Sequence, residues 1–218
     1  MIKLATEPQF NIVEIFQSLQ GEGYNTGMDA IFIRFGKCNL ACPWCDTDYL
    51  SYSTLSLSEI LKQVEALNAT NIIITGGEPS VVPEIDLLLK QLKQRGYFLT
   101  IETNGLQPVP SEIDFISASP KALYAKKYHS QMLTQADEVR IVVDGDVFDF
   151  CQFIEQHLPA KHYYLSPCEQ ITASSSKTSS PSFTLLETLQ LLGRLNQRAQ
   201  GQPHWQLSLQ THKLLGIR

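Results

Sequence analysis

The chain has no long apolar run. Nowhere in its 218 residues does a stretch approach the roughly 18 consecutive apolar residues that a membrane-spanning helix needs. The N-terminal residues 1–16 (MIKLATEPQFNIVEIF) also lack an apolar core long enough for a secretion signal. We therefore expect a soluble, cytoplasmic protein with no membrane partner.

The chain also lacks an excess of positive charge. It carries 17 Lys and Arg against 22 Asp and Glu, a net charge of −5. A nonspecific nucleic-acid binder would show a basic footprint, so we expect no nucleic-acid partner. One or two local cations can still hold a small anionic substrate.

Cysteine is scarce, and the number of cysteines is odd. There are five, which does not suit a disulfide framework. In a reducing compartment such a set indicates a metal site. Cys38, Cys42 and Cys45 lie within eight residues of each other. Cys151 stands alone and is expected to be a small buried residue, whereas Cys168 has both a packing and a functional interpretation.

What the chain does have is an alternation of β-rich and helical segments. Helical faces are predicted from Ile60 to Leu67, with Ser56 and Glu59 at capping-box spacing, and from Ile85 to Leu92, with Gly96 as a C-terminal stop. Further helices are predicted at 147–158 and 185–195. The expected strands are 30–35, 71–75, 97–101, 115–118, 139–143, 162–165 and 205–209.

This order predicts parallel β/α units in one α/β domain spanning residues 1–218. Residues 173–182 (ASSSKTSSPS) are six-tenths serine and are expected to form a loop that is mobile. Polar, Gly- and Pro-bearing motifs repeatedly follow the predicted strands, where β/α barrels and open α/β sheets place their active sites. Five such motifs indicate a single shared site.

The three clustered cysteines have the spacing C-x3-C-x2-C on a loop after a strand. One interpretation is a structural zinc site, which normally needs a fourth protein ligand, and no second cysteine pair exists to supply one. The other is a 4Fe–4S cluster with three thiolate ligands and one open iron, since thiolates suit iron–sulfur chemistry.

The combination of C-x3-C-x-Trp-C with Gly-Gly-Glu-Pro at 76–79 resembles the radical S-adenosylmethionine (radical SAM) superfamily. The resemblance implies an incomplete, TIM-like β/α barrel. It also implies that SAM chelates the open iron and that reduction releases a 5′-deoxyadenosyl radical. Gly-Gly-Glu-Pro alone would also suit an ordinary tight turn.

A narrower resemblance, from residue 14 onward, is to the 7-carboxy-7-deazaguanine synthase family of the queuosine pathway. The segments that carry it are FQSLQGEG (16–23), Arg34, CDT (45–47), TGGEP (75–79), ETNG (102–105), SPK (119–121) and LQTHKLLGIR (209–218). It implies a lyase that converts 6-carboxy-5,6,7,8-tetrahydropterin by C6 hydrogen abstraction, ring contraction and loss of ammonia. Magnesium assists, and SAM is regenerated.

The resemblance assigns roles residue by residue. Thr47 is the magnesium ligand, and Asp46 could order a coordinated water. Arg34 suits the substrate carboxylate, because a guanidinium fork matches that group. The implied substrate-binding residues are Leu19, Gln20, Gly21, Glu22, Arg34, Thr75, His212 and the terminal carboxylate of Arg218. For Gln20 and Glu22 taken alone, the sequence equally fits an exposed polar turn.

For SAM, the implied contacts are Gly77, Glu102, Asn104, Ser119, Pro120, Lys121, Ser166, Pro167, Cys168 and Glu169. At 166–169 this chain has Ser-Pro-Cys-Glu where many relatives have Gln-Pro-Met-Asp, which leaves those side-chain contacts open. The resemblance also implies a homodimer and an electron donor such as flavodoxin or ferredoxin.

Two rival functions share part of this pattern. An activating enzyme that places a glycyl radical on a partner protein would share the cysteines and Gly-Gly-Glu-Pro, but would not need Gln-Gly-Glu-Gly, Thr47 or the Thr-His-Lys tail. A non-catalytic zinc or electron-transfer module would need four protein ligands and would not cleave SAM.

Overall fold

The computed structural model describes residues 7–168 and 185–217. Within them lies one nine-stranded sheet with the order β3-β1-β2-β4-β5-β6-β7-β8-β9. The strands are β1 Gln9–Leu19, β2 Asp29–Phe35, β3 Ser53–Ser56, β4 Asn71–Gly76, β5 Phe98–Thr103, β6 Phe115–Ala118, β7 Glu138–Val143, β8 His162–Pro167 and β9 Trp205–Leu207. From β2 to β9 every neighbouring pair is parallel, and β1 pairs antiparallel with β2 and β3.

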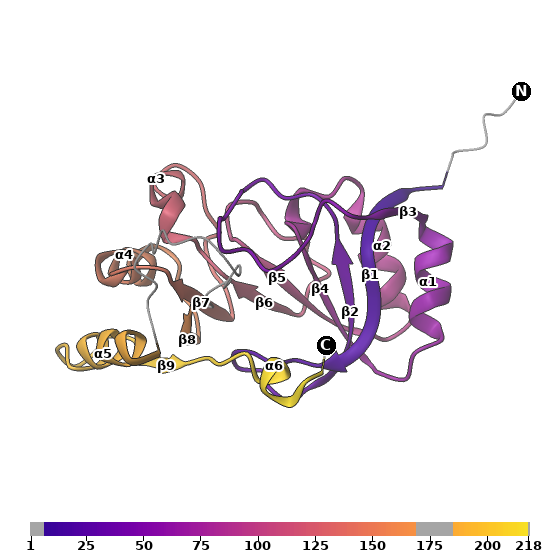
Figure 1. Cartoon of the computed structure of the whole chain (residues 1–218). Coiled ribbons are helices and arrows are strands. Elements are labelled where there is room, and N and C mark those ends of the chain that lie inside the picture. The colour runs from indigo at the N-terminus through magenta and orange to yellow at the C-terminus, as the bar shows by residue number, and fades with distance from the viewer. Residues whose placement is uncertain (1–6, 169–184, 218) are drawn as a thin grey trace, which may run out of the picture.

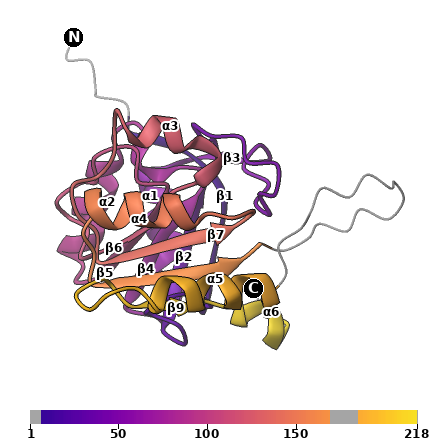
Figure 2. The ribbon, with the colours of Figure 1, turned by 90° about the vertical axis from the view of Figure 1, so that its left-hand side faces the viewer.

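The sheet curves without closing, so the predicted incomplete barrel is confirmed (Figure 1). The α-helices are α1 Leu57–Glu65, α2 Ile85–Gln94, α3 Ala125–Tyr128, α4 Phe148–His157, α5 Leu185–Asn196 and α6 Thr211–Leu215, with 3-10 turns at Pro79–Val81 and Ala122–Tyr124. Figure 2 shows α4 and α5 lying over the sheet at the β7–β9 end, while α1 and α2 cover the other end.

The predicted helix signals form as expected. The Ser56 side chain accepts the Glu59 N–H and Glu59 bonds back to the Ser56 N–H, which completes the capping box. Gly96 follows the α2 C-cap with φ +84°, a left-handed conformation that glycine adopts at low cost.

The central strands are buried on both faces, as their continuous apolar runs indicate. Ile31, Ile33 and Ile72 pack outward with α1 and α2, whereas Phe32 and Ile73 belong to a separate inner cluster with Phe16 and Met28. A second large core joins β7 and β8 to α4 and α5. The inner cluster around Phe32 makes that part of the barrel interior apolar.

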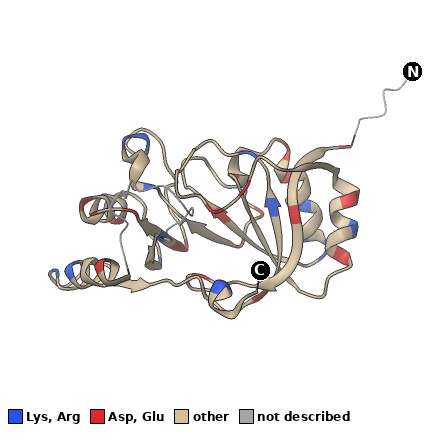
Figure 3. Ribbon diagram, in the orientation of Figure 1, with Lys and Arg blue, Asp and Glu red and all other residues tan. Residues whose placement is uncertain are grey.

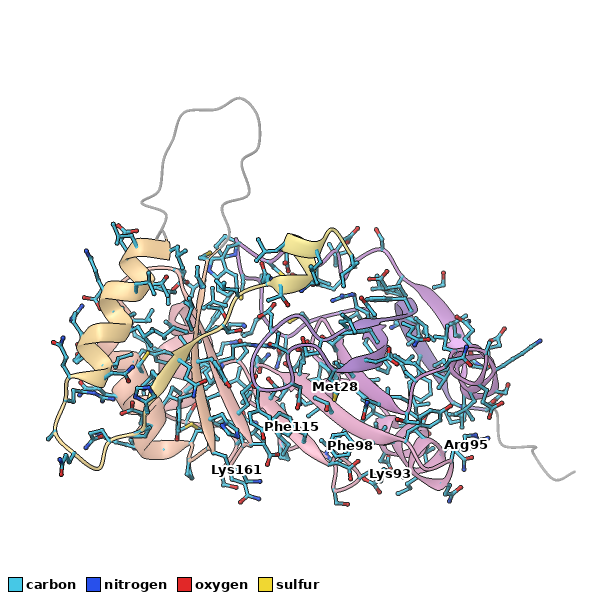
Figure 4. All side chains as sticks on the ribbon, turned by 90° about the horizontal axis from the view of Figure 1, so that it is seen from below. Met28, Lys93, Arg95, Phe98, Phe115 and Lys161 are labelled. Atoms are coloured by element: carbon cyan, nitrogen blue, oxygen red, sulfur yellow. The ribbon has the colours of Figure 1, made fainter. Side chains whose placement is uncertain are left out.

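The N-terminal ends of the strands form the rim away from the predicted motifs. Figure 4 labels Phe98 and Phe115, at the starts of β5 and β6, and Lys161, just before β8, all along this rim. Charges of both signs are interspersed over the described helices and loops (Figure 3). In the described part of the chain, no helix is both long and apolar enough to cross a membrane.

Candidate active site

A cavity of about 580 Å³ opens at the C-terminal ends of the parallel strands. Its wall takes residues from the loop after β1, the cysteine loop after β2, the ends of β4, β5 and β8, and helix α6. These segments are far apart in sequence and meet because parallel strands carry their C-terminal ends to the same edge. The single shared site predicted from the motifs therefore corresponds to one cavity.

The cysteine loop is fastened at several points. The Tyr124 hydroxyl accepts the Ala41 N–H at 3.1 Å and donates to the Ala41 carbonyl at 2.8 Å. The Trp44 indole donates to Asp144 at 2.8 Å, and the Lys121 ammonium lies 5.4 Å above the Trp44 ring. These contacts attach the loop to the wall formed after β6 and β7.

Cys38, Cys42 and Cys45 all line this cavity and are half-buried. Burial raises the pKa of the Cys38 and Cys42 thiols, and the neighbouring thiols raise it further, while Lys121 opposes the rise at Cys42. Among the described residues, no three His, Cys, Asp or Glu side chains converge as one metal ion would require. Three thiols spread around a common volume suit a cluster that takes each thiolate at a different corner.

The end of β4 is packed too closely for any side chain. An added Cβ on Gly77 would overlap the Lys37 carbonyl, and one on Gly76 would overlap the Phe35 backbone. Gly77 N–H donates to the Phe35 carbonyl at 2.9 Å, and Glu78 N–H to the Lys37 carbonyl at 3.0 Å. Glycine here lets the strand end touch the cysteine loop directly.

Glu78 is 1% exposed and connects two strand ends. Its carboxylate accepts from Ser80, from the Thr103 hydroxyl at 2.6 Å and from the Asn104 N–H at 2.7 Å. The Asn104 amide in turn donates to Asn39 in the cysteine loop at 2.7 Å. The Gly-Gly-Glu-Pro motif thus fixes the Glu-Thr-Asn-Gly motif against the cysteine loop.

The loop after β1 forms the opposite wall with the C-terminal segment. Gly21 C=O accepts both the N–H and the hydroxyl of Thr211, at 3.0 and 2.9 Å. His212 packs directly over Gly21, where a Cβ would collide with its ring. The Gln210 amide donates to Glu22 at 3.0 Å. The structure therefore brings the predicted Gln-Gly-Glu-Gly and Thr-His-Lys motifs into contact.

Arg34 lies on β2 between this wall and the cysteine loop. Its Nε donates to Glu14 at 2.9 Å, and its Nη1 lies 3.5 Å from the Thr47 hydroxyl. Asp46 also lines the cavity, where Lys213 of α6 pairs with it at 2.9 Å. An anionic group at this corner would meet a guanidinium and a hydroxyl together.

Arg140, which the sequence motifs do not single out, also lines the cavity. It stands on β7 with an 8% exposed side chain, bonds Glu102 at 2.7 Å and lies within 4 Å of Glu22 and Glu138. Burial alone would lower its pKa, but the three carboxylates raise it above the ordinary value. The only sequence signal was one arginine inside the apolar run VRIVV.

Glu102 joins this arginine to two predicted substrate residues. It accepts from the Gln20 amide at 3.0 Å and from the Thr75 hydroxyl at 2.8 Å. Burial raises its pKa, but the Arg140 charge and these hydrogen bonds outweigh it and bring the pKa down to about 2. Glu102 thus lies with Gln20 and Thr75, although it was expected to contact SAM.

Ser166 and Lys121 lie on the side expected to take SAM. The Ser166 hydroxyl lines the cavity, is buried and makes no hydrogen bond within the described residues. The Lys121 ammonium donates to Ser119 at 2.6 Å, and burial lowers its pKa. A buried donor without a partner at the cavity wall is what a polar cofactor would satisfy.

Most predicted site residues line the cavity. They are Leu19, Gln20, Gly21, Glu22, Arg34, Cys38, Cys42, Cys45, Thr47, Thr75, Gly77, Glu102, Asn104, Ser119, Lys121, Ser166, Pro167, Cys168 and His212. Pro120 is buried beside this wall and does not line it. Glu169, Arg218 and the serine-rich residues 173–182 lie outside the described residues.

The chain is similar to known proteins in sequence and in fold. The family model of the radical SAM superfamily matches residues 32–124, which include the cysteine loop and the β4 end. The chain superposes on the crystal structure of QueE from Escherichia coli with a TM-score of 0.67 at 24% identity, covering 93% of this chain and 94% of that one. That likeness concerns the fold.

Sequence relatives cover almost the whole chain. The 7-carboxy-7-deazaguanine synthase of Haemophilus influenzae is 58% identical over 97% of this chain and 95% of its own length. That of Neisseria meningitidis serogroup B is 55% identical over 99% and 98%. The chain therefore belongs to the 7-carboxy-7-deazaguanine synthase family of the radical SAM superfamily.

Proposed function

We propose that this protein converts 6-carboxy-5,6,7,8-tetrahydropterin into 7-carboxy-7-deazaguanine and ammonia, in the queuosine pathway. The main observation behind this proposal is that one cavity combines three thiols, a cationic corner at Arg34 that suits an anion, and a polar wall that suits a heterocycle. When bound, the 4Fe–4S cluster and SAM supply the radical that removes the C6 hydrogen. The protein's own residues hold and orient what reacts.

The substrate carboxylate is assigned to Arg34. Its guanidinium faces the cavity beside the Thr47 hydroxyl, 3.5 Å away. A bidentate guanidinium–carboxylate pair fixes orientation as well as position. Thr47 is proposed as a magnesium ligand at the same corner, because Mg²⁺ needs few protein ligands when substrate and water supply the rest.

The ring of the pterin is assigned to the part of the cavity lined by the β1–β2 loop, α6 and the ends of β4 and β5. Glu22 and Glu102 offer carboxylate acceptors there, and Thr75 and His212 lie beside them. Gln20 has a supporting role, because its side-chain NH2 donates to Glu102 and its side-chain oxygen Oε1 accepts the Glu22 N–H at 3.0 Å. Both functional groups of Gln20 are thereby used to hold the acceptors in place.

SAM is assigned to the opposite side of the cavity. The SAM amino group is assigned to Gly77 on the family resemblance, and Gly77 lines the cavity beside the cysteine loop. Asn104, Ser119, Lys121, Ser166 and Cys168 line this side, and Ser166 has a hydroxyl available. The dimer and the flavodoxin- or ferredoxin-like electron donor expected from the sequence are proposed on family resemblance alone.

The test is anaerobic reconstitution with iron and sulfide, followed by SAM, Mg²⁺, a reductant and the carboxypterin. We expect a deazapurine product by mass spectrometry, and none from Cys42→Ala. Cleavage of SAM without a deazapurine would contradict this assignment and favour another radical enzyme, such as a glycyl-radical activating enzyme.

A further inference from the structure

Arg140 is a buried cation whose neighbours are the acceptors of the proposed substrate wall. Residues alternate along β7, so Arg140 and Val142 line the cavity while Ile141 packs into the outer core. Only 8% of the Arg140 side chain is exposed. A charge buried this deeply is costly unless it is paired. The groups that pair with Arg140 therefore indicate its role.

The guanidinium bridges two segments that are distant in sequence. Its Nη2 donates to Glu102 Oε1 on β5 at 2.7 Å. Its Nη1 lies 3.5 Å from Glu22 Oε2 in the β1–β2 loop but makes no hydrogen bond within the described residues. A buried N–H donor left in this state at a cavity wall is expected to be satisfied by a bound group.

Three carboxylates, those of Glu22, Glu102 and Glu138, surround the Arg140 guanidinium. The Lys121 ammonium also interacts electrostatically with Glu22. Glu138 is 2% exposed and is satisfied by the Tyr24 N–H at 2.6 Å and the Ser117 hydroxyl at 2.8 Å. Glu22 and Glu102 also accept hydrogen bonds within the protein, from Gln210 and from Gln20, Thr75 and Arg140 respectively. Unlike Glu138, they line the cavity, with side chains 19% and 22% exposed. The cavity therefore presents two acceptors to a ligand.

Two adjacent carboxylates select a ligand edge that carries adjacent N–H donors. In a pterin, that edge is the 2-amino group and the neighbouring ring N–H. Arg140 also keeps the pKa of Glu102 near 2, so this carboxylate accepts hydrogen bonds and does not donate them. An analogue with oxygen in place of the amino group would put an acceptor against an acceptor.

We propose that Arg140 is a specificity-determining positioning residue, which holds Glu22 and Glu102 as paired acceptors for the 2-amino-4-oxopyrimidine edge of the substrate and offers Nη1 to the same ring. This inference rests on the proposed function, which supplies the heterocycle. A site whose buried acceptors bond the N–H donors of a substrate strongly rejects analogues that lack those donors.

The test compares equilibrium binding of 6-carboxytetrahydropterin with that of its 2-oxo counterpart. It uses anaerobic enzyme loaded with the cluster and SAM, without reductant, so that no turnover occurs. For the wild type we expect the pterin to bind at least about 100-fold more tightly than the analogue. For Arg140→Met we expect this preference to fall at least tenfold, because the two acceptors are no longer held in register.

Arg198→Met is the matched control. Arg198 forms a partly buried ion pair with Glu155, at 2.6 and 2.8 Å, away from the cavity. Its loss should lower stability while leaving the preference at the wild-type value. Arg140→Lys keeps the charge but cannot bridge both carboxylates, so it should also lose most of the preference, even if Arg140→Met does not fold.

The inference would be overturned if folded Arg140→Met, or Arg140→Lys, bound the pterin over its 2-oxo analogue with the same preference as the wild type. Product formation by the wild type would then leave the proposed function intact. A wild type that cleaves SAM but neither binds nor converts the carboxypterin would overturn both.

Discussion

At the scale of single residues, the site depends on a few positions where a small change of side chain would disrupt the packing or the hydrogen bonds. Gly77 is the clearest case, because a Cβ at this position would overlap the backbone at the start of the cysteine loop. Glu102 is the second, because one carboxylate receives hydrogen bonds from Gln20, Thr75 and Arg140.

Gly77→Ala should impair cluster loading. The added methyl group overlaps the Lys37 carbonyl and crowds the Cys38 N–H, so the cysteine loop must move. We expect iron content after reconstitution to fall by at least half and unfolding free energy to fall by roughly 2 kcal/mol. Gly193→Ala on α5 meets nothing within 4 Å and should leave iron content unchanged. Equal iron content in the two variants would refute this reading.

Glu102→Gln should change the acid sensitivity of the cluster-free protein. Because the folded pKa is about 2 against an ordinary 4.5, the ionised carboxylate stabilises the fold above about pH 4.5. That contribution is lost as the pH falls toward 2. In urea unfolding, the stability difference between wild type and variant should shrink by on the order of 2 kcal/mol between pH 5 and pH 2.5.

Glu65→Gln, on an exposed helix face 54% accessible, controls for the loss of a carboxylate. Its effect on stability should be small at both pH values, because the exposed ion pair that it loses, with Arg95, contributes little. A pH-independent difference for Glu102→Gln would mean that Arg140 does not hold this carboxylate ionised in solution.

At the scale of elements, side chains from neighbouring segments fasten the cysteine loop in place. The Tyr124 hydroxyl bonds both backbone groups of Ala41, next to Cys42. The sequence did not indicate this contact, because a tyrosine in a short 3-10 turn has no pattern that names its partner 83 residues away.

Tyr124→Phe should shorten the lifetime of the bound cluster. Losing two hydrogen bonds to the loop costs about 1 to 2 kcal/mol in holding its closed geometry, so bleaching of the absorption near 400 nm under a chelator should be about fivefold faster or more. Tyr163→Phe removes a hydroxyl with two similar bonds, to Ala160 and Leu158, away from the cavity. Identical bleaching rates for these variants would contradict the assigned role of Tyr124.

The elements themselves were largely predictable. Strands β2, β4 and β6 and helices α1 and α2 have apolar periods and end signals that agree with the structure. Strand β1 was missed, because the irregular register between Ile12 and Glu14 interrupts its alternation. Helix α6 was missed because it has five residues and no side-chain cap, so packing against Gly21 fixes it.

The site was predictable where backbone or sulfur chemistry demands a particular residue, as at the cysteines and Gly77. Arg140 was not, because a strand reading VRIVV indicates only burial. What makes its charge tolerable is Glu22 and Glu102, which reach it from distant segments. Side-chain partners of this kind are set by the tertiary fold.

At the scale of the whole molecule, the cavity lies between two cores. One joins β1, β2, β4 and β5 to α1 and α2, and the other joins β7 and β8 to α4 and α5. A bound group that touches both walls should therefore stabilise the two halves together.

Loading the cluster and SAM should raise the melting temperature. At SAM concentrations 100 times the dissociation constant, binding adds about 2.7 kcal/mol, which for a chain of this size corresponds to about 5 to 10 °C. Differential scanning calorimetry with and without SAM, on cluster-loaded protein, measures this shift. The cluster-free protein is the control, and an equal shift there would show that SAM binds elsewhere.

The central claim is that this cavity carries out one radical reaction on a carboxypterin. The most direct measurement is the yield of 7-carboxy-7-deazaguanine per chain, by mass spectrometry, together with the SAM remaining in the same anaerobic reaction. We expect many product molecules per chain, with most of the SAM retained. Unchanged carboxypterin beside steadily consumed SAM would contradict it.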